Sequence, residues 1–208
     1  DEVADFDSGL LNAEGHDVVV IGGGDTAMDC VRTAIRQKAN SVTCLYRRDR
    51  ANMPGSQREV ANAEEEGVDF RWLSAPQAFL GDNHVRAVQA QKIHLGQPDA
   101  TGRQVPQIIE DSSHEIPADL VIKALGFDPE DIPTMFGAPE LEVSKWGTIG
   151  VDWRTMMTNL PGVFAAGDIV RGASLVVWGV RDGRDAAESI HSYIMAQSEA
   201  PRTAAAGA

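Results

Sequence analysis

The chain has 208 residues, 43% of them hydrophobic, with 31 acidic and 18 basic side chains and a formal net charge of −13. This length supports one large domain or two small ones, and the negative charge disfavours nucleic acid and anionic membrane surfaces as partners. No apolar run approaches the roughly 18 residues of a membrane span, and we expect a cytoplasmic protein.

The sequence begins without an initiator methionine or a signal peptide, which is typical of a fragment of a longer protein. We expect residues 1–16 to be a linker. At the other end, residues 197–208 are small and repetitive, and we expect a disordered tail there.

The most informative segment lies just after the linker, where a short apolar run enters three glycines. Residues 18–21 predict a buried strand, and residues 26–37 predict an amphipathic helix. Gly22, Gly24 and Ala27 fit G-x-G-x-x-A. In that pattern the first glycine makes a tight turn, the second lets the backbone approach a pyrophosphate, and the third position packs the helix on the strand.

The helix after this turn begins at Asp25 or Thr26 and would point its free N–H groups at the phosphates. Gly23 completes the turn. The alternative is a glycine-rich turn that binds nothing. The strand–turn–helix–strand context favours a dinucleotide site.

The end of the second predicted strand, residues 42–46, indicates which dinucleotide is bound. An NAD site usually has an acidic residue there, whereas this chain has Arg47 and Arg48, with Arg50 just beyond. Guanidinium groups suit a ribose 2′-phosphate, so the sequence favours NADP. Asp49 supports the alternative that these arginines are solvated loop charges.

The rest of the first half alternates a helix with further strands. The third strand should be parallel to the first two by the crossover rule, and the segment after it predicts a β-meander whose polar residues 95–117 form an exposed hairpin or a mobile loop. The expected elements are a helix over 58–66 and strands over 69–73, 78–80, 85–95, 107–109 and 120–124.

The second half has a different pattern, with a boundary expected at Gly126. Residues 129–145 are irregular, 148–151 and 163–166 predict short strands, and 175–196 predict a long helix.

A second candidate site lies where an apolar segment ends in Gly167 and Asp168. An aspartate at the carboxyl end of a strand can accept a hydrogen bond from a sugar or ribityl hydroxyl, and the helix that follows presents N–H groups to a phosphate or a ring carbonyl. The alternative is a buried aspartate that caps the next segment.

No catalytic or metal-binding set is evident in the sequence. Cys30 and Cys44 do not form C-x-x-C and fit small core residues, and the five histidines lack metal-ligand spacing.

Five motifs in order resemble the family of small (β) subunits of NADPH-dependent glutamate synthase, over its C-terminal part, and more widely the flavoproteins with two dinucleotide-binding domains. Together they cover most of residues 17–195. The motifs lie at residues 20–30, 45–54, 119–129, 160–168 and 174–187.

This resemblance implies an α/β fold: a Rossmann-like, three-layer NADPH-binding domain over residues 17–126, with a parallel sheet and a β-meander. Residues 127–196 would then be the C-terminal piece of a split FAD-binding domain, with Gly126 at the crossing point. It further implies that Asp168 contacts the FAD and that the N–H groups of Val176 and Val177 lie near the flavin.

The family's first half carries another glycine-rich motif for FAD and cysteines for [4Fe–4S] clusters, and neither is present here. We therefore expect FAD binding only together with that half, and no iron–sulfur cluster in this segment. The segment after Gly126 would lack its normal sheet neighbours, and three alternatives stay open: it packs on the NADPH-binding domain, it pairs with another copy as a homodimer, or it is mobile.

In the complete enzyme, the resemblance implies hydride transfer from NADPH to FAD and electron delivery to the large (α) subunit for glutamate synthesis. The cofactor carries this chemistry, so we expect binding residues and no catalytic side chain. The alternatives are a related electron-input module for a ferredoxin-type or pyrimidine-reductase partner, and a non-catalytic NADP-binding fragment.

Overall fold

The computed structural model describes residues 12–98 and 104–199. The chain divides into two compact units between Leu125 and Gly126. Most of the expected linker (residues 1–11), part of the meander turn (99–103) and most of the expected tail (200–208) lie outside the described residues.

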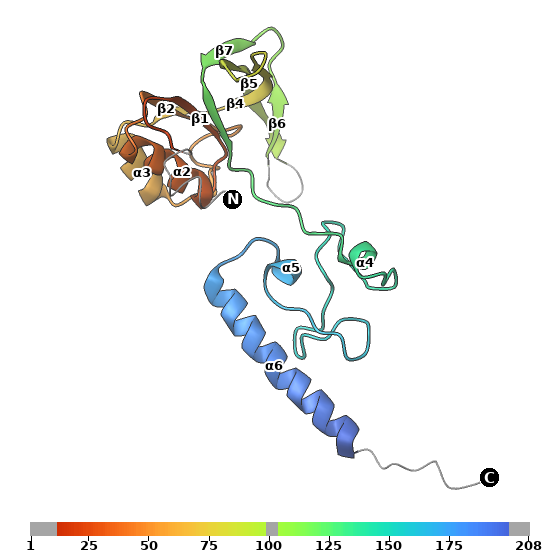
Figure 1. Cartoon of the computed structure of the whole chain (residues 1–208). Helices are drawn as coiled ribbons and strands as arrows, with labels where there is room; N and C mark the ends of the chain where they lie inside the picture. Colours follow the sequence, from red (N-terminus) through yellow and green to blue (C-terminus); the bar gives the residue numbers. More distant parts are fainter. Residues whose placement is uncertain (1–11, 99–103, 200–208) are drawn as a thin grey trace, which may run out of the picture. The chain divides into compact units, whose positions relative to one another are not determined.

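A parallel sheet forms the centre of the first unit (Figure 1). Its four strands lie in the order β3-β2-β1-β8, so that β1 pairs with β2 on one side and with β8 on the other. The third strand is parallel to the second, as the crossover rule predicts. The strands are β1 (Asp17–Ile21), β2 (Ser41–Leu45), β3 (Asp69–Arg71) and β8 (Leu120–Lys123).

Two helices, α2 (Asp25–Arg36) and α3 (Gln57–Glu65), cover one face of this sheet (Figure 1). Val18 and Val20 point from β1 into the core beneath them. The two helices are joined by Arg32, whose guanidinium forms ion pairs with Glu59 and, at 2.7 Å, with Glu66.

Antiparallel strands cover the opposite face of the sheet. Val19 and Ile21 alternate with the helix-facing valines of β1 and pack against Val88 and Ile116 of this second sheet. The predicted three-layer α/β fold with a parallel sheet and a β-meander is therefore confirmed. Its antiparallel strands are β4 (Ser74–Leu80), β5 (Ala87–Pro98), β6 (Gln104–Ile108) and β7 (His114–Pro117).

For residues 95–117 the sequence predicts an exposed hairpin or a mobile loop, and their described part contains a hairpin. β6 forms a hairpin with β5, and β7, which the sequence did not predict, pairs with the other part of β5. Backbone pairing with the long central strand orders this segment even though its side chains are mostly polar.

The second unit consists of loops and helices. The last of these helices extends to Glu199, three residues beyond the predicted end at 196. The helices are α4 (Ile132–Met135), α5 (Asp168–Arg171) and α6 (Val176–Glu199).

The strands predicted over 148–151 and 163–166 do not form in the described part of this unit. Ile149 and Phe164 make only isolated bridges, to Val143 and Met157 respectively. The local pattern suits a strand, but a strand requires a neighbour to complete its hydrogen bonds, and none is available here.

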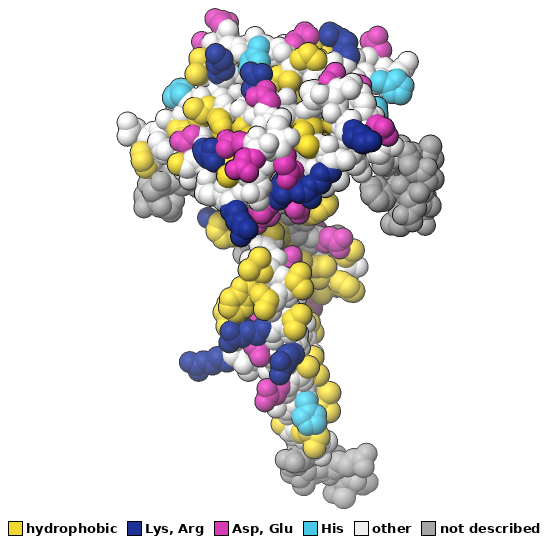
Figure 2. Space-filling model, turned by 90° about the vertical axis from the view of Figure 1, so that its left-hand side faces the viewer, with side chains coloured by type: hydrophobic (Ala, Val, Ile, Leu, Met, Phe, Trp, Pro, Cys, Tyr) yellow, Lys and Arg dark blue, Asp and Glu magenta, His cyan; other side chains and the backbone are white. Residues whose placement is uncertain are grey.

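More of the large apolar side chains are exposed in the second unit than in the first, where Phe79 and Leu125 are among the exposed ones. Phe127 is fully exposed, and Val176 and Val177 at the start of α6 are 84% and 66% exposed. Figure 2 shows hydrophobic side chains on the surface of this unit, in the lower part of the view. None of the described helices combines the length and apolar character needed to cross a membrane.

Candidate functional site

The three glycines follow β1 directly, at the carboxyl end of a strand with neighbours on both sides. Gly22 has φ of +153°, and a Cβ there would lie 2.3 Å from the carbonyl oxygen of Ala124, just after β8. At Gly23 a Cβ would lie 2.3 Å from the ring of Tyr46. These two glycines are thus required by the protein's own packing.

Gly24 differs from its two neighbours because a Cβ built there meets no protein atom within 4 Å. Its φ of −90° is also open to any residue. The packing of the chain therefore does not explain this glycine, whereas close approach of a ligand to the backbone would.

The start of α2 offers donors beside this open space. Gly24 is the N-cap residue and its carbonyl accepts hydrogen bonds from Ala27 and Met28. Among the described residues, the N–H groups of Asp25 and Thr26 have no acceptor. Together with the helix dipole, these free donors make an anion site of the kind that holds a pyrophosphate.

The Asp25 carboxylate would repel phosphate if it faced the same space. Instead it accepts a hydrogen bond of 3.0 Å from the backbone N–H of Ser56. The adjacent Gly55 N–H donates to the carbonyl of Gly23 at 2.9 Å. We call residues 52–56 the latch loop, because these bonds hold the loop against the glycine turn.

Tyr46 connects the latch loop to the end of β2. Its ring lies against Gly23, and its hydroxyl lies 3.1 Å from the carbonyl oxygen of Asn52, to which it donates. Residues 52–56 were not singled out from the sequence. The adjacent Pro54 and Gly55 indicate a constrained turn, but nothing in the sequence indicates that this turn bonds to Gly23 and Asp25.

The arginines after β2 differ in their surroundings. Arg47 is exposed, whereas the Nε atom of Arg48 is buried and has no hydrogen-bond partner. The backbone carbonyl of Arg48 is held by the N–H of Leu73 at 3.0 Å. A buried guanidinium nitrogen that lacks an acceptor fits an anionic ligand at this position.

Arg50 is engaged elsewhere, since one of its terminal nitrogens lies 2.7 Å from both carboxylate oxygens of Glu64. Asp49 also has its own partners, the backbone and side-chain nitrogens of Asn52 at 2.9 and 2.8 Å. The acid that argued for a simple charged loop is therefore used within that loop and does not neutralise Arg47 or Arg48.

The second candidate site lies at α5 and the start of α6. Gly167 has φ of +81°, a conformation that favours glycine, and the Asp168 carboxylate is exposed with no partner among the described residues. Gly126, at φ of +80°, likewise has open space around it. The alternative that Asp168 is a buried cap is wrong, because its side chain is exposed.

An ion pair that the sequence did not suggest connects α5 with α6. Arg171 donates from Nε and Nη2 to the two carboxylate oxygens of Asp182, at 2.5 and 2.7 Å. The side chain of Asp182 is only 2% exposed. These hydrogen bonds from the Arg171 guanidinium hold the pKa of the Asp182 carboxyl below its usual range.

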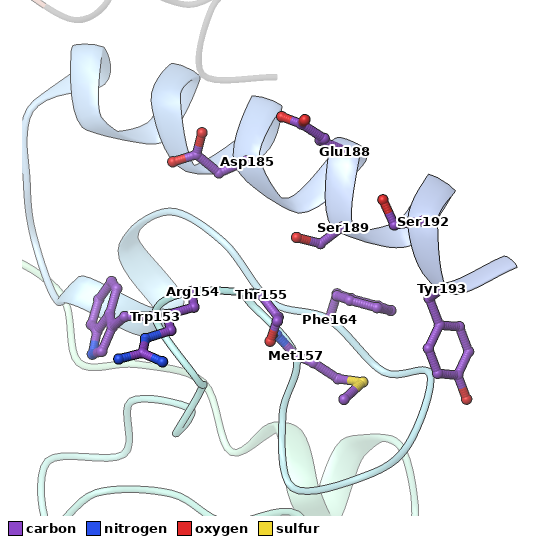
Figure 3. A pocket seen from close by; sticks show the side chains of 10 residues that line it. All are labelled: Trp153, Arg154, Thr155, Met157, Phe164, Asp185, Glu188, Ser189, Ser192 and Tyr193. Atoms are coloured by element: carbon purple, nitrogen blue, oxygen red, sulfur yellow. The ribbon is translucent and has the colours of Figure 1, made fainter. Parts of the chain in front are cut away.

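An open cavity of about 580 Å³ lies in the second unit between α6 and the loop before α5 (Figure 3). Phe164 and Tyr193 meet edge to face at its border, with ring centroids 5.8 Å apart. None of the residues predicted for cofactor binding lines it. Its lining is Trp153, Arg154, Thr155, Met157, Phe164, Asp185, Glu188, Ser189, Ser192 and Tyr193.

No group of three or more metal-ligating side chains occurs within residues 12–98 and 104–199. Burial raises the pKa of the Cys44 thiol to about 12. It raises the pKa of Cys30 as well, with a further contribution from Asp29. Both thiols are therefore protonated near neutral pH and unsuited to nucleophilic chemistry.

The three-layer unit and its glycine turn define a Rossmann-like dinucleotide-binding domain. Residues 2–200 match the family described as pyridine nucleotide-disulphide oxidoreductase, and the chain belongs to that family.

Among curated relatives, the chain is 68% identical over 206 residues to a glutamate synthase [NADPH] small chain of Azospirillum brasilense, covering 99% of this chain and 43% of that protein. It is 45% identical to the corresponding small chain of Escherichia coli (90% of this chain, 41% of that one). It is 48% identical to the putative oxidoreductase AegA of E. coli (91% and 29%). The chain thus spans less than half the length of these relatives.

Solved structures show the same fold. A thioredoxin reductase of Lactococcus lactis is 25% identical with a TM-score of 0.72, over 93% of this chain and 56% of that one. FprA of Mycobacterium tuberculosis, solved in complex with NADPH, shares the fold at 16% identity with a TM-score of 0.71, over the same shares of the two chains.

Proposed function

We propose that this chain binds NADPH in its first unit and forms the electron-input portion of a glutamate synthase small chain. The observation that carries the proposal is the open space at Gly24, beside the free N–H groups of Asp25 and Thr26. A pyrophosphate at this place would bind to backbone donors and to the positive end of α2.

The ribose 2′-phosphate would bind Arg48 and Arg47. The unpartnered Nε of Arg48 supports this assignment, as does the exposed guanidinium of Arg47. Arg50 would have a smaller part, since a ligand would have to compete with Glu64 for it.

In the second unit, the exposed carboxylate of Asp168 and the first N–H groups of α6, those of Val176 and Val177, would face FAD. Flavin accepts a hydride when bound, and the protein contributes position and electrostatics. We propose that this unit needs the part of the small chain that the match does not cover, because its exposed apolar side chains have no cover in the described residues.

The partner of the complete protein would be the glutamate synthase large chain. With only two cysteines in the sequence, we propose that no iron–sulfur cluster is held by this segment alone, since such clusters usually take four. A homodimer through the second unit stays a prediction, and sedimentation of the purified chain would test it.

A second candidate is an NADPH-dependent electron-input module for a different acceptor. The similarity to AegA, 48% against 45% for the E. coli glutamate synthase small chain, favours keeping it. Binding of the purified protein to the A. brasilense large chain, measured by co-purification, separates the two. Failure to associate while NADPH binds would favour the second candidate.

The test of nucleotide binding is a titration of the chain with NADPH and NADH, followed by nicotinamide fluorescence. We expect NADPH to bind at least about tenfold more tightly, from one charge-assisted phosphate contact. Gly24→Val should abolish binding while changing stability by no more than about 1 kcal/mol, through the poorer N-cap. If the folded chain bound neither nucleotide, the proposal would be wrong.

A further inference from the structure

The Asp182 carboxylate joins the two elements that flank the second candidate site. It accepts two hydrogen bonds from the guanidinium of Arg171, which is the last residue of α5. The backbone of Gly167, the residue before Asp168, also helps to lower the pKa of this carboxyl. One buried carboxylate on α6 thereby holds the last residue of the short α5.

Arg171 is further restrained by two indole rings. Its guanidinium carbon lies 4.8 Å from the ring centre of Trp153 and 5.0 Å from that of Trp178. Trp153 belongs to the loop before α5 and Trp178 to the first turn of α6. The guanidinium is therefore held by the Asp182 carboxylate and by cation–π contacts with two indoles, which restrict its orientation.

The position of this cluster relates it to the predicted flavin contacts. Arg171 lies three residues after Asp168, and Asp182 lies within two turns of Val176 and Val177 on the same helix. α5 is only four residues long, so its own hydrogen bonds cannot hold Asp168 in place. Burying the Asp182 carboxylate, whose side chain is 2% exposed, carries a high desolvation cost unless it is paired, and the partly exposed Arg171 supplies that pairing in a defined geometry.

We propose that Arg171 and Asp182 are positioning residues that hold the Asp168 carboxylate and the N-terminus of α6 in one arrangement for contact with the flavin. This inference rests on the proposed function. It assigns a role to two side chains that are not themselves among the proposed nucleotide or flavin contacts.

The test uses a full-length protein in which this chain is joined to the part of the A. brasilense small chain outside the match. Asp182→Asn removes one charge of the pair at nearly constant volume, and Arg171→Gln removes the other with a shorter polar side chain. We expect each to weaken FAD binding by at least about tenfold, because α5 loses the charge-assisted hydrogen bonds that hold it to α6. The double variant should be no worse than either single variant, since both act through one contact.

Two controls separate positioning from general stability. Arg184→Gln removes an exposed arginine from the same helix and should leave FAD affinity unchanged. Arg171→Lys keeps the charge but loses the fork and the stacking, so it should not restore affinity. In Arg171 or Asp182 variants that still bind FAD, the N-terminus of α6 should no longer be held close to the flavin. The midpoint potential of the flavin should then shift to more negative values.

A second measurement uses the 208-residue chain without flavin. Arg171→Gln should change the tryptophan near-ultraviolet circular dichroism, because Trp153 and Trp178 lose the guanidinium between them. Unchanged FAD affinity and potential in the Arg171 and Asp182 variants would overturn the positioning role. A full-length protein without these substitutions that bound no FAD would instead overturn the proposed function, and the inference would fall with it.

Discussion

The two units of this chain differ in how completely their elements satisfy one another. In the first unit, β1 is buried on both faces and pairs on both edges, so the glycine turn at its end is fixed by contacts within that unit. In the described part of the second unit, two segments with strand-like sequences make only isolated bridges, and apolar residues at the start of α6 are exposed. A glycine turn can thus be fixed by contacts within its own unit, whereas the second unit leaves much of its apolar surface uncovered among the described residues.

The largest effect should come from Gly22→Ala, which challenges the first unit at its tightest point. The new Cβ would meet the Ala124 carbonyl at 2.3 Å in a backbone conformation that disfavours side chains. We expect a loss of about 3 kcal/mol or more in the free energy of unfolding. Urea denaturation followed by far-ultraviolet circular dichroism measures it, with Gly24→Ala as the matched control.

A cavity in the core of the first unit should cost nearly as much. Met28 on α2 is 1% exposed, so Met28→Ala should destabilise the protein by about 2–5 kcal/mol. Val177→Ala in the second unit removes an exposed side chain and should change stability by less than about 0.5 kcal/mol. Equal losses for the two variants in urea would contradict the contrast between the units.

The preference for NADPH over NADH should depend on the three arginines to different degrees, according to whether each side chain already has an ion-pair partner. Arg48→Gln should reduce the preference for NADPH over NADH by about tenfold or more, and Arg47→Gln by a similar or smaller factor. Arg50→Gln should have the smallest effect, because Glu64 already binds that side chain. Competition binding with both nucleotides measures this order, and unchanged preference in Arg47→Gln and Arg48→Gln would argue against an NADP site.

Lowering the pH should disturb one identifiable contact in the second unit, the ion pair between Arg171 and Asp182, more than it disturbs the first unit. The pKa of Asp182 is lowered in the folded chain, chiefly by its hydrogen bonds with Arg171. Its contribution to stability is thus fully present above the unfolded pKa of about 3.9 and is lost as pH falls through the lower folded pKa.

Below about pH 4, we therefore expect the signal from the tryptophans around Arg171 to change. Asp182→Asn should already show that altered signal at pH 7 and should respond less to acid. In the first unit, Arg32 lowers the pKa of Glu66, so the contribution of that carboxylate to stability is also lost in acid. The buried sheet of the first unit does not depend on this ion pair. Near-ultraviolet circular dichroism between pH 7 and about pH 2 makes the comparison.

The sequence predicted the first unit well because its signals are local. The valines of β1 alternate between two faces, and the glycine pattern lies within a few residues of its helix. The contact of Gly22 with Ala124 could not be predicted, since it joins residues about a hundred positions apart. The wrongly predicted strands of the second unit have the same cause, because propensity describes a residue but pairing requires a neighbour.

In the candidate sites, too, local motifs could be predicted from the sequence, whereas contacts between distant residues could not. Glycines and arginines were visible as motifs, whereas the pairing of Arg50 with Glu64 and of Arg171 with Asp182 required the fold. Charged residues are common on surfaces, and nothing in the sequence around Asp182 marks it as buried.

The latch loop has a consequence for how a two-ended ligand is bound. Through hydrogen bonds of Gly55, Ser56 and Tyr46, it connects the glycine turn, where we propose that the pyrophosphate binds, with the end of β2, where the arginines begin. A ligand held at one end would therefore meet the other at a high effective concentration, with little loop entropy left to lose. The whole nucleotide should then bind far more tightly than the separate affinities of its two halves would suggest.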